Sequence, residues 1–539
     1  MAKTITDHNV SWNTVHDNGP FDTETLYETL LDDSISNDID RYNDASIEIC
    51  RLIEKCRSDN KRFRAYGSSW STSKIAHQQD RMHYNAAMDI SIRIAQDQLH
   101  TSSSFKSENL FLFQCGNTIK QVSRELLKHK KSLKTSGASN GQTIAGAVST
   151  GVHGSAFDVG AMQDYVVGIN LIIGPTPNDL IYLERHTQPA LNDQFATSLK
   201  SRIIRNDGLF NAALVGLGSF GFMAGLVIEA EDVFLLKRYT KAIKKLDAVE
   251  LAESLNFEDS NFKIDSELNP DGTGKRPYHF KVYINPYNED EDGVVEIMYK
   301  KSYREDYPNP IPIVAQYIFK DLPSWIASFA AKHKRMVPKI IRALKKIIFP
   351  TLDQVSEGTL ADIFWDSTFR GAGFAWALGI DHKDTKKALD LFVKLLNEEG
   401  PVPGAIAIRF VKASKATLAF TKFPITCILE MDGIQWKPNR RMISMEDIER
   451  KIIEKFMAHK IPFTWHWGKN ATWNFPGLID YMYGDKDDEW KNYRSALLSR
   501  EMADLFTNDF LIKAGLGDYR KNVPSTLIDS LNVNTNNTI

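Results

Sequence analysis

The sequence predicts a mixed α+β protein built from two large units, and three observations support this fold class. First, 42% of the 539 residues are hydrophobic and 25% are charged, so the chain can bury apolar cores. Second, short β-prone segments alternate with helix-like segments along most of the chain. Third, a strongly charged stretch at residues 232–240 separates a loop-rich region with glycine and serine clusters from a region of mixed strand-like and helix-like runs. This predicts a domain boundary near residue 235.

The first unit begins with residues 22–59, which are rich in acids and helix formers. Apolar residues at loosely helical spacing, such as Leu26, Leu30, Ile47 and Ile53, predict helices there. From residue 62 to 155, β-prone pieces are interrupted by glycine and serine clusters, which is typical of loop-rich α/β sequence. The strands that we expect in this unit are 63–66, 110–114, 165–173 and 225–231.

The second unit, residues 236–470, mixes strand-like and helix-like runs and predicts an α+β domain. We expect strands at 279–284, 294–299, 406–412 and 426–431, and helices at 385–398 and 445–459. Residues 490–520 look helical again. The Asn-rich end, residues 530–539, has too little apolar content to order itself, so we expect disorder there.

Charge and cysteine usage exclude several classes of protein. Lys+Arg is 66 and Asp+Glu is 68, a formal charge of -2, so we expect no nucleic-acid partner. Four scattered cysteines, Cys50, Cys56, Cys115 and Cys427, are too few for a disulfide scaffold or a four-thiolate zinc site, and we expect no metal. The first residues lack the pattern of a secretory signal, and no run approaches the roughly 18 to 20 apolar residues of a membrane span. A cytoplasmic protein is the expectation.

Three glycine-rich segments are candidates for ligand binding. GLGSFG (216–221) fits the G-x-G-x-x-G pattern, but a strand-like run follows it where a dinucleotide-binding unit needs a helix. RAYGSSWS (64–71) and SGASNGQTIAGAVSTGVHG (136–154) are more informative, because consecutive small residues let backbone amides surround an anion. Two such loops would clasp a pyrophosphate, and tight turns in an ordinary α/β fold are the alternative.

Longer runs around these loops resemble a known family. QTIAGAVSTGVHGSAFDVGAMQDYVVGINLIIG (142–174) resembles the central signature of the vanillyl-alcohol oxidase or p-cresol methylhydroxylase (PCMH) type of FAD-linked oxidoreductases, in the branch of aldonolactone and alditol oxidases. RAYGSSWS resembles the family's pyrophosphate loop, and NDGLFNAALVGLGSFG (206–221) its third conserved segment. HWGK (466–469) and FTNDFL (506–511) are similar to motifs near the end of that branch, and IAIR (406–409) more weakly resembles a strand of its substrate domain.

The resemblance implies a fold, a cofactor and a reaction. The fold would be α+β, with a two-subdomain PCMH-type FAD-binding domain at 1–235, an α+β cap (substrate) domain at 236–470, and a segment at 471–539 that returns to the FAD domain. FAD would be the cofactor, a small-molecule alcohol such as a sugar-derived alcohol or aldonolactone the substrate, and oxygen or another acceptor the oxidant. Substrate would bind between the two domains.

The family's pattern also implies which residues contact FAD. They are Gly67, Ser68, Ser69, Trp70 and Ser71 in the first loop, Ser136, Gly137, Asn140, Gly141, Thr143, Ile144, Ala145, Gly146, Thr150, Gly151, His153 and Gly154 in the second, and the backbone of Val227.

One departure from the pattern concerns the attachment of the flavin. Many relatives carry a histidine in the first loop and bond the flavin to it, whereas this chain has Trp70 at the matching position. Tryptophan cannot form that bond, so we expect dissociable FAD. Attachment through another residue, such as His77 or His83, is the alternative.

The resemblance assigns three catalytic residues. The family moves a hydride from the alcohol carbon to flavin N5 while a base takes the hydroxyl proton. Lys469 would stabilise the negative charge of the reduced flavin, and His466 would accept the proton. Arg409 and Lys469 match the polar pair of alditol oxidases. For His466, a hydrogen-bonded structural histidine is the alternative.

A second departure concerns the substrate. Many sugar-lactone and polyol relatives have Glu-x-Arg where this chain has Ala407-Ile-Arg409, so a carboxylate that orients hydroxyls is replaced by a methyl group. A less hydroxylated alcohol becomes conceivable. Two further hypotheses therefore stand beside the sugar-alcohol oxidoreductase: a peripheral-membrane flavoenzyme for a sterol-like alcohol, and a flavin-binding protein without turnover.

Residues 311–350 contain a basic amphipathic segment. Lys339, Arg342, Lys345 and Lys346 alternate with isoleucine and leucine at helical spacing, which separates charge from apolar side chains. Such a face is a candidate for contact with a membrane surface. The alternative is a helix packed on the cap with a solvated basic edge.

Overall fold

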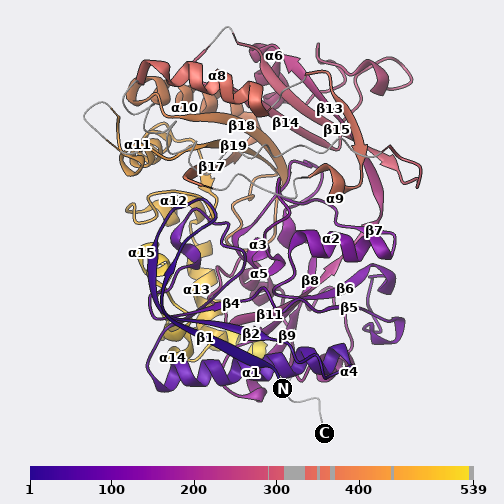
Figure 1. Cartoon of the computed structure of the whole chain (residues 1–539), viewed down its shortest axis with the longest axis vertical. Helices are drawn as coiled ribbons and strands as arrows, with labels where there is room; N and C mark the ends of the chain where they lie inside the picture. The colour runs from indigo at the N-terminus through magenta and orange to yellow at the C-terminus, as the bar shows by residue number, and fades with distance from the viewer. Residues whose placement is uncertain are drawn as a thin grey trace.

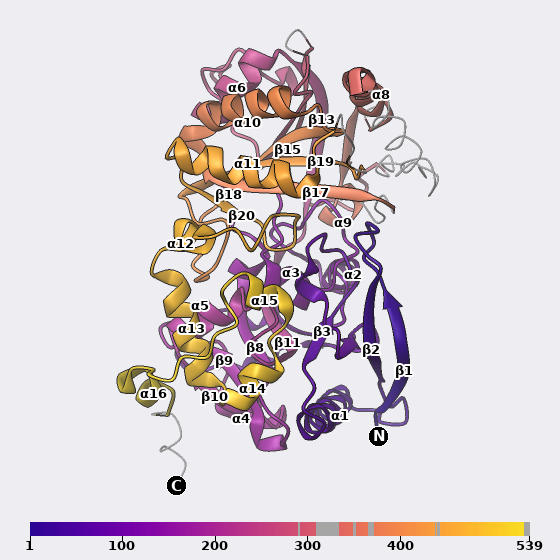
Figure 2. The same cartoon turned by 90° about the vertical axis from the view of Figure 1, so that its left-hand side faces the viewer.

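The computed structural model describes residues 1–288, 291–308, 334–348, 352–364, 371–436, 438 and 442–532. Two sheets with their helices form the first domain, and a larger sheet with its helices forms a cap above it (Figure 1). The last helices of the chain run back along the side of the first domain (Figure 2). The mixed α and β architecture agrees with the predicted fold class.

The first domain contains a four-stranded and a six-stranded sheet. The four-stranded sheet has the order β1 (Lys3–Trp12), β2 (Phe21–Leu30), β4 (Arg81–Tyr84), β3 (Phe63–Tyr66). The six-stranded sheet has the order β10 (Arg202–Arg205), β9 (Leu180–Glu184), β8 (Val166–Ile172), β11 (Phe222–Glu229), β6 (Leu110–Gln114), β5 (Ser91–Arg93). Helix α1 (Asp38–Ser58) contacts β2 of the first sheet and β5 and β8 of the second, so it joins the two subdomains.

The region 22–59 corrects one prediction, because its first third is a strand rather than a helix. In β2 the side chains of Thr23, Thr25, Tyr27 and Thr29 are buried and alternate with more exposed ones. This period of two is the signature of a strand with one buried face. Helix α1 begins only after Asn37, whose side chain caps it by accepting a hydrogen bond from the backbone N–H of Asp40.

Smaller elements complete the first domain. They are α2 (Ile119–Lys128), α3 (Ile144–Thr150), α4 (Asp193–Ser198), α5 (Asp207–Leu214) and the strand pair β7 (Lys131–Ser132) and β12 (Glu231–Asp232). The segment 216–221 is a turn between α5 and β11, in which Gly218 and Gly221 take φ values of +66° and +105°. A strand follows this turn, as predicted, so the glycine pattern is not that of a dinucleotide-binding unit.

The cap is built on an eight-stranded sheet. Its order is β16 (Val355–Gly358), β13 (Phe234–Ile243), β15 (Gly293–Ser302), β14 (His279–Ile284), β18 (Gly404–Lys412), β19 (Ile425–Ile434), β17 (Gly373–Asp381), β20 (Phe463–Trp465). Helices α6 (Lys245–Ser254), α10 (Thr385–Glu399) and α11 (Met445–Ala458) cover one face, with α6 against β15 and α10 against β17 and β19. The other face turns toward the first domain, where the short helix α9 (Leu360–Ile363) also lies (Figure 1).

The chain ends in helices that pack on the first domain. They are α12 (Leu478–Tyr483), α13 (Lys486–Leu497), α14 (Arg500–Leu505), α15 (Asp509–Lys513) and α16 (Ser525–Asn532). Helix α13 lies against α5, and α14 lies against α1. The predicted disordered tail overlaps α16 at residues 530–532, and residues 533–539 lie outside the described part.

The basic amphipathic segment is described only in part, since residues 309–333 and 349–351 lie outside the described residues. Helix α8 (Val337–Ile348) buries Val337 and Ile341 against Tyr287 and Ala405 of the cap. The side chain of Arg342 is exposed and lies 3.3 Å from Glu291. For these residues the structure shows a helix packed on the cap with a basic outer edge.

Two general features bear on the predicted class of protein. Among the described residues no helix is long and apolar enough to cross a bilayer, and no group of three or more His, Cys, Asp or Glu side chains could hold a metal ion. All four cysteines are free and buried.

Candidate functional site

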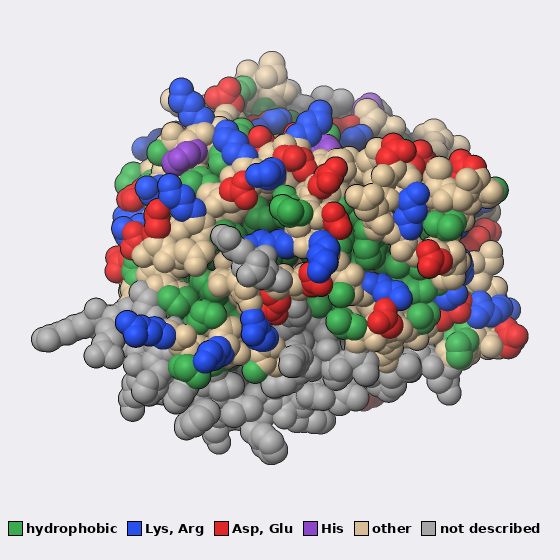
Figure 3. Space-filling view, turned by 90° about the horizontal axis from the view of Figure 1, so that it is seen from above, with side chains coloured by type: hydrophobic (Ala, Val, Ile, Leu, Met, Phe, Trp, Pro, Cys, Tyr) green, Lys and Arg blue, Asp and Glu red, His purple; other side chains and the backbone are tan. Residues whose placement is uncertain are grey.

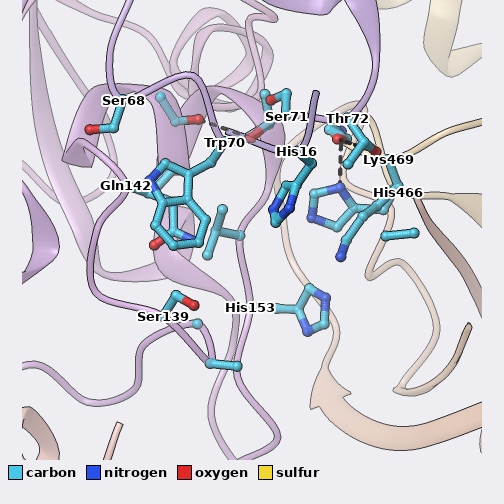
Figure 4. A pocket seen from close by; sticks show the side chains of 18 of the residues that line it. His16, Ser68, Trp70, Ser71, Thr72, Ser139, Gln142, His153, His466 and Lys469 are labelled. Carbon is cyan, nitrogen blue, oxygen red and sulfur yellow. Dashed lines mark hydrogen bonds between the residues drawn. The ribbon is translucent and has the colours of Figure 1, made fainter. Parts of the chain in front are cut away.

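A cavity of about 730 Å³ lies between the first domain and the cap. Its walls come from the two glycine- and serine-rich loops, from the turn 216–223 and from the inner face of the cap sheet. In Figure 4, Trp70 and Gln142 lie on one side, His466 and Lys469 on the other, with His16 between them and His153 below.

The first loop, residues 67–71, is a tight turn directly after β3. Ser69 has a φ of +56°, and its carbonyl accepts a hydrogen bond from the N–H of Val15 at 2.9 Å. A Cβ on Gly67 would lie 1.9 Å from Oγ1 of Thr143, so the two loops touch at a point where only glycine fits. The Trp70 ring rests on Gly141 in the same way, because a Cβ there would lie 2.4 Å from Cζ2 of the ring.

The second loop keeps polar groups available for a ligand. Asn140 Oδ1, Gln142 Oε1 and Thr143 Oγ1 are buried and make no hydrogen bond within the described residues. Thr143 precedes α3 as its N-cap residue, yet its hydroxyl does not cap the helix. Because buried polar groups are normally paired, this loop fits a ligand with both donors and acceptors. The two amide oxygens need N–H or O–H groups, which FAD has in its flavin ring and its hydroxyls, and the Thr143 hydroxyl can donate to a phosphate oxygen.

The cavity wall contains most of the residues that the family pattern assigns to FAD. Those that line it are Ser68, Ser69, Trp70, Ser71, Gly137, Thr143, Ala145, Gly146, Thr150, His153 and Gly154. Those that do not are Gly67, Ser136, Asn140, Gly141, Ile144, Gly151 and Val227.

Two of these residues belong to the hydrophobic core. Val227 is completely buried in the middle of β11, between β6 and β8, and Ile144 is completely buried at the start of α3. At this side of the cavity the wall is formed instead by Phe222 and Met223, at the beginning of β11. Val227 does not line the cavity, and its predicted backbone contact with FAD stays a prediction.

The histidines suggested for covalent attachment do not line the cavity. His77 packs beside Trp12 and Phe21, and its Nε2 lies 2.9 Å from the carbonyl oxygen of Asp22. Both ring nitrogens of the buried His83 are engaged, Nε2 with Thr29 and Nδ1 with Asn85.

The HWGK motif connects the cap to the first loop. Trp467 is fully buried, stacks on Trp473 with ring centroids 4.8 Å apart, and donates a hydrogen bond to the carbonyl of Leu418. The carbonyl of Gly468 accepts a hydrogen bond from the N–H of Thr72 at 2.8 Å. These anchors fix the backbone on both sides of Lys469, whose side chain lines the cavity.

Lys469, Arg409 and Glu430 form a buried ion cluster on the inner face of the cap sheet. Nζ of Lys469 lies 3.0 Å from Oε1 of Glu430, and Nη2 of Arg409 lies 2.8 Å from Oε2 of the same carboxylate. Asp432 lies 3.6 Å from Nζ of Lys469 and exposes about half of its side chain, at 52%. Because Asp432 lines the cavity, we infer that this exposed part faces it.

The pKa values of the cluster follow from burial and from its opposite charges. Burial alone would raise the pKa of Glu430, but Arg409 and Lys469 outweigh it and hold this pKa well below its usual range. Burial would lower the pKa of Lys469, but Glu430 and Asp432 raise it. The pKa of Asp432 is raised, by burial and by the charge of Glu430. Lys469 and Glu430 are therefore charged at neutral pH, while Asp432 is the carboxylate that takes up a proton more readily.

The geometry of His466 does not fit the predicted role of proton acceptor. Its Nδ1 accepts a hydrogen bond from the N–H of Gly468 at 3.0 Å, so in the neutral ring the proton sits on Nε2. Burial and the neighbouring His153 and Lys469 lower the pKa of His466 well below its ordinary value. His466 is thus a neutral ring whose free nitrogen donates, and sequence reasoning could not see the backbone N–H that decides this.

The carboxylate that seemed lost from strand 404–412 is supplied by the next strand. Ala407 lies directly opposite Glu430 in the antiparallel β18–β19 pairing, and Ala405 lies opposite Asp432. Directly opposite residues project from the same face of a sheet, so Glu430 occupies the space beside Arg409 that Ala407 leaves open. A carboxylate thus stands beside Arg409 although residue 407 is an alanine, and the choice of substrate stays a prediction.

Sequence reasoning also missed Lys281 and His16, which line the cavity. Lys281 is paired with Arg409 across β14 and β18, and burial and that guanidinium lower the pKa of Lys281 to about 8. His16 comes from the turn between β1 and β2. No motif marks any of these residues, because strand pairing or a distant turn brings them to the cavity.

Comparison with known proteins agrees with the geometry of the first domain. Residues 46–176 match the family described as FAD binding domain. A D-arabinono-1,4-lactone oxidase of Candida glabrata is 20% identical over 208 residues, 39% of this chain and 35% of that protein. A putative D-arabinono-1,4-lactone oxidase of Neurospora crassa is 28% identical over 127 residues, 24% of this chain and 19% of that protein. The matches thus span about a third and a fifth of the length of these relatives.

The whole fold is shared with solved oxidases. Cholesterol oxidase from Brevibacterium sterolicum superposes with a TM-score of 0.66 at 12% identity, covering 95% of this chain and 97% of that one. Xylooligosaccharide oxidase from Myceliophthora thermophila superposes with a TM-score of 0.55 at 12% identity, covering 92% and 93%. At this identity the likeness concerns the fold alone. The chain therefore contains an FAD-binding domain at residues 46–176, FAD is its cofactor, and its overall fold is that of these oxidases.

Proposed function

We propose that the protein is an FAD-dependent oxidoreductase that oxidises a CH–OH group of a hydroxylated, sugar-derived alcohol or aldonolactone, with oxygen as the acceptor. The observation that carries the proposal is the Arg409–Glu430–Lys469 cluster, because it faces, across one cavity, the loops that fit FAD. When bound, the flavin supplies the hydride acceptor. The names of the curated relatives, two arabinonolactone oxidases, support the substrate class.

The two cations of the cluster prepare the cavity for negative charge. Lys469 and Arg409 are held in place by one carboxylate, so they need no rearrangement when charge develops on the substrate oxygen or the cofactor. Glu430 positions both cations. Its Oε2 is buried and lies 2.8 Å from Nη2 of Arg409, so this carboxylate acts through the cations rather than on the substrate.

Asp432 is the group that we assign to accept the hydroxyl proton. It reaches the cavity, and burial together with Glu430 raises its pKa, which makes it a stronger base than Glu430. His466, with its proton on Nε2, donates a hydrogen bond to the substrate oxygen instead. In this proposal Asp432 accepts the proton, the role predicted for His466, and the neutral imidazole of His466 binds the substrate oxygen.

The residues around Glu430 and Asp432, on the face of the cap sheet that lines the cavity, support a hydroxylated substrate. Alanines surround the two acids, with Ala377 opposite Glu430 and Ala375 opposite Asp432 on β17, and Ala407 and Ala405 on the other side. Of the two carboxylates, Asp432 is accessible to a ligand, with 52% of its side chain exposed, while Glu430 is buried behind it. Carboxylates accept hydrogen bonds from several hydroxyls at once, which a sugar-derived alcohol offers.

A lipophilic alcohol is the second candidate, and one observation favours it. Part of the cavity wall is apolar, formed by Met298, Ile341, Phe364 and Phe374, and Ile341 belongs to the basic helix α8. On the described part of the upper face, however, lysines and arginines alternate with acids, and neither sign dominates (Figure 3). Co-sedimentation with anionic and neutral vesicles tests the membrane contact, and binding to neither would exclude it.

We also propose that the FAD is dissociable. Trp70 occupies the loop position at which relatives bond the flavin, and His77 and His83 lie outside the cavity wall. Acid precipitation should leave the yellow chromophore in the supernatant. A yellow pellet would contradict this, and peptide mapping would then begin with His16 and His153, which do line the cavity.

The experiment that tests the function is the anaerobic absorption spectrum of the purified protein, recorded with alditols, aldonolactones, aldoses and lipophilic alcohols. Bleaching of the flavin band near roughly 450 nm by one class identifies the reaction and the substrate class together. Readmission of air with formation of hydrogen peroxide would support oxygen as the acceptor. A flavin that no alcohol bleaches would favour a binding protein without turnover.

A further inference from the structure

The hairpin β1–β2 lies at the edge of the first domain, outside residues 46–176 that match the FAD-binding family. Most side chains of β1 are exposed, so the strand contributes little to the core. Its turn, residues 13–20, reaches toward the cap and the start of β17 (Figure 2). This turn carries His16 into the cavity.

Hydrogen bonds from three other parts of the chain hold the turn in place. The N–H of Val15 donates to Ser69 in the first loop. The carbonyl of His16 accepts from the N–H of Gly373, at the start of β17, and from Nε2 of Gln435, beyond β19. Asn470, the neighbour of Lys469, donates to the side chain of Asn18. His16 is therefore fixed at the junction of the FAD loop, the cap sheet and the HWGK loop.

The ring of His16 differs from the other two histidines of the cavity. His466 and His153 each engage Nδ1 with backbone, at Gly468 and Gly154 respectively. Neither ring nitrogen of His16 makes a hydrogen bond with any described residue. The ring packs edge-on against Trp70, with centroids 6.0 Å apart (Figure 4).

The charge state of His16 is also defined. Burial and the charge of Lys469 lower the pKa of His16 to about 4, so the ring is neutral at neutral pH. A neutral imidazole carries one N–H donor and one acceptor nitrogen. Both are available between Trp70 and Lys469 in the cavity (Figure 4), and buried polar groups of this kind are normally paired.

We propose that His16 is a substrate-binding residue, which hydrogen-bonds the hydroxyl on the carbon next to the reacting CH–OH group, and that the hairpin β1–β2 is a part of the active site. This inference rests on the proposed function. One donor and one acceptor match a hydroxyl, which both gives and takes a hydrogen bond, better than they match a carboxylate or an ammonium group. His16 thereby sets specificity for a vicinal diol.

The test compares ribitol with pentane-1,3,5-triol, which lacks the hydroxyl next to either of its two terminal CH₂OH groups. The variants are His16→Ala, His16→Gln, which keeps a donor and an acceptor, and His8→Ala, an exposed histidine of the same hairpin that lies outside the cavity. The rate of anaerobic flavin reduction gives kcat/KM for each pair, and FAD content and Tm report on folding.

We expect the wild-type protein and His8→Ala to prefer ribitol by at least about 10-fold, since a missing partner leaves a buried polar group unpaired. His16→Ala should lose this preference, and His16→Gln should keep part of it, with FAD content unchanged. A His16→Ala variant that keeps the full preference overturns the inference, as does a wild-type protein that reduces equally fast with both probes. A wild-type protein that no alcohol reduces overturns the proposed function itself.

Discussion

The two walls of the cavity are built on opposite principles. The wall from the first domain is formed largely by small, uncharged residues from two loops, beside larger ones such as Trp70, and it offers backbone amides and hydroxyls. The wall from the cap carries charged side chains from separate strands, Lys281 on β14, Arg409 on β18 and Glu430 on β19, beside apolar residues. The residues of the first wall lie close together in the sequence and form short motifs. The charged residues of the second wall come together only when the cap strands pair in register.

This difference separates cofactor recognition from substrate recognition. A cofactor that is bound by backbone amides needs small side chains around it. In the sequence this need is visible as runs of glycine and serine. A substrate that is held by charge requires ions of both signs at defined positions, which many sequences can supply. Three of the four predictions that follow alter one wall and ask whether the other keeps its function, and the fourth concerns Glu449, which does not line the cavity.

Lys469→Met should abolish most turnover while FAD stays bound, because the cap wall loses its central cation and the first wall is untouched. Loss of one preorganised charge of this kind costs about 10²- to 10³-fold in rate. Stopped-flow reduction of the flavin measures the effect, and Lys412→Met, at the exposed end of β18, is the control. Unchanged reduction by Lys469→Met would remove the role assigned to this residue.

Glu430→Ala should lower kcat/KM for a hydroxylated substrate by about 10²-fold, since Arg409 and Lys469 lose the carboxylate that positions them. Ala407 lies directly opposite, so the double variant Ala407→Glu/Glu430→Ala returns a carboxylate to nearly the same place from the other strand. It should recover at least about 10-fold of the loss. A double variant no better than Glu430→Ala would show that the position of the carboxylate on β19 is essential.

Gly67→Ala should weaken FAD binding without touching the cap. The new Cβ would lie 1.9 Å from Oγ1 and 2.8 Å from Cβ of Thr143, so both loops must move. Overpacking of about 1–3 kcal/mol predicts a rise of about 10- to 100-fold in the dissociation constant of FAD, measured by flavin fluorescence. Gly272→Ala, in a cap turn with a φ of +81° and no atom within 4 Å, is the control for backbone strain that does not reach the FAD loops. Equal FAD affinity in both variants would contradict the predicted contact between the loops.

Glu449→Gln should change stability and its pH dependence, with little effect on turnover. Glu449 lies on α11 and accepts a hydrogen bond from Trp376 of β17. Burial raises its pKa to about 7, so the folded protein keeps this proton while the unfolded chain loses it above about pH 4.5. The stability that this gives is present below pH 4.5 and lost as the pH rises through 7.

We therefore expect wild type to lose about 2–3 kcal/mol relative to Glu449→Gln between pH 4.5 and 8. Urea unfolding at several pH values measures the difference. A difference that stays constant with pH would mean that Glu449 is ionised in the folded protein.

Much of the fold was readable from local patterns. The strands at 63–66 and 110–114 have the predicted boundaries, because each is a short apolar run between turn residues. The interpretation of residues 22–30 as a helix was wrong, since threonines that alternate along one buried face indicate a strand. Helix formers nearby dominated the local composition, while pairing with β1 and β4 decided the structure.

The sequence by itself determined the FAD-binding loops, the cation of the HWGK motif and the mixed architecture, because each depends on neighbouring residues whose chemistry is visible in the chain. Only the tertiary structure decided that Glu430 stands opposite Ala407, that the backbone at Gly468 fixes the proton of His466, and that a hairpin from the start of the chain brings His16 beside Trp70. These contacts join residues far apart in sequence. They arise from strand register and chain packing, which no local pattern specifies.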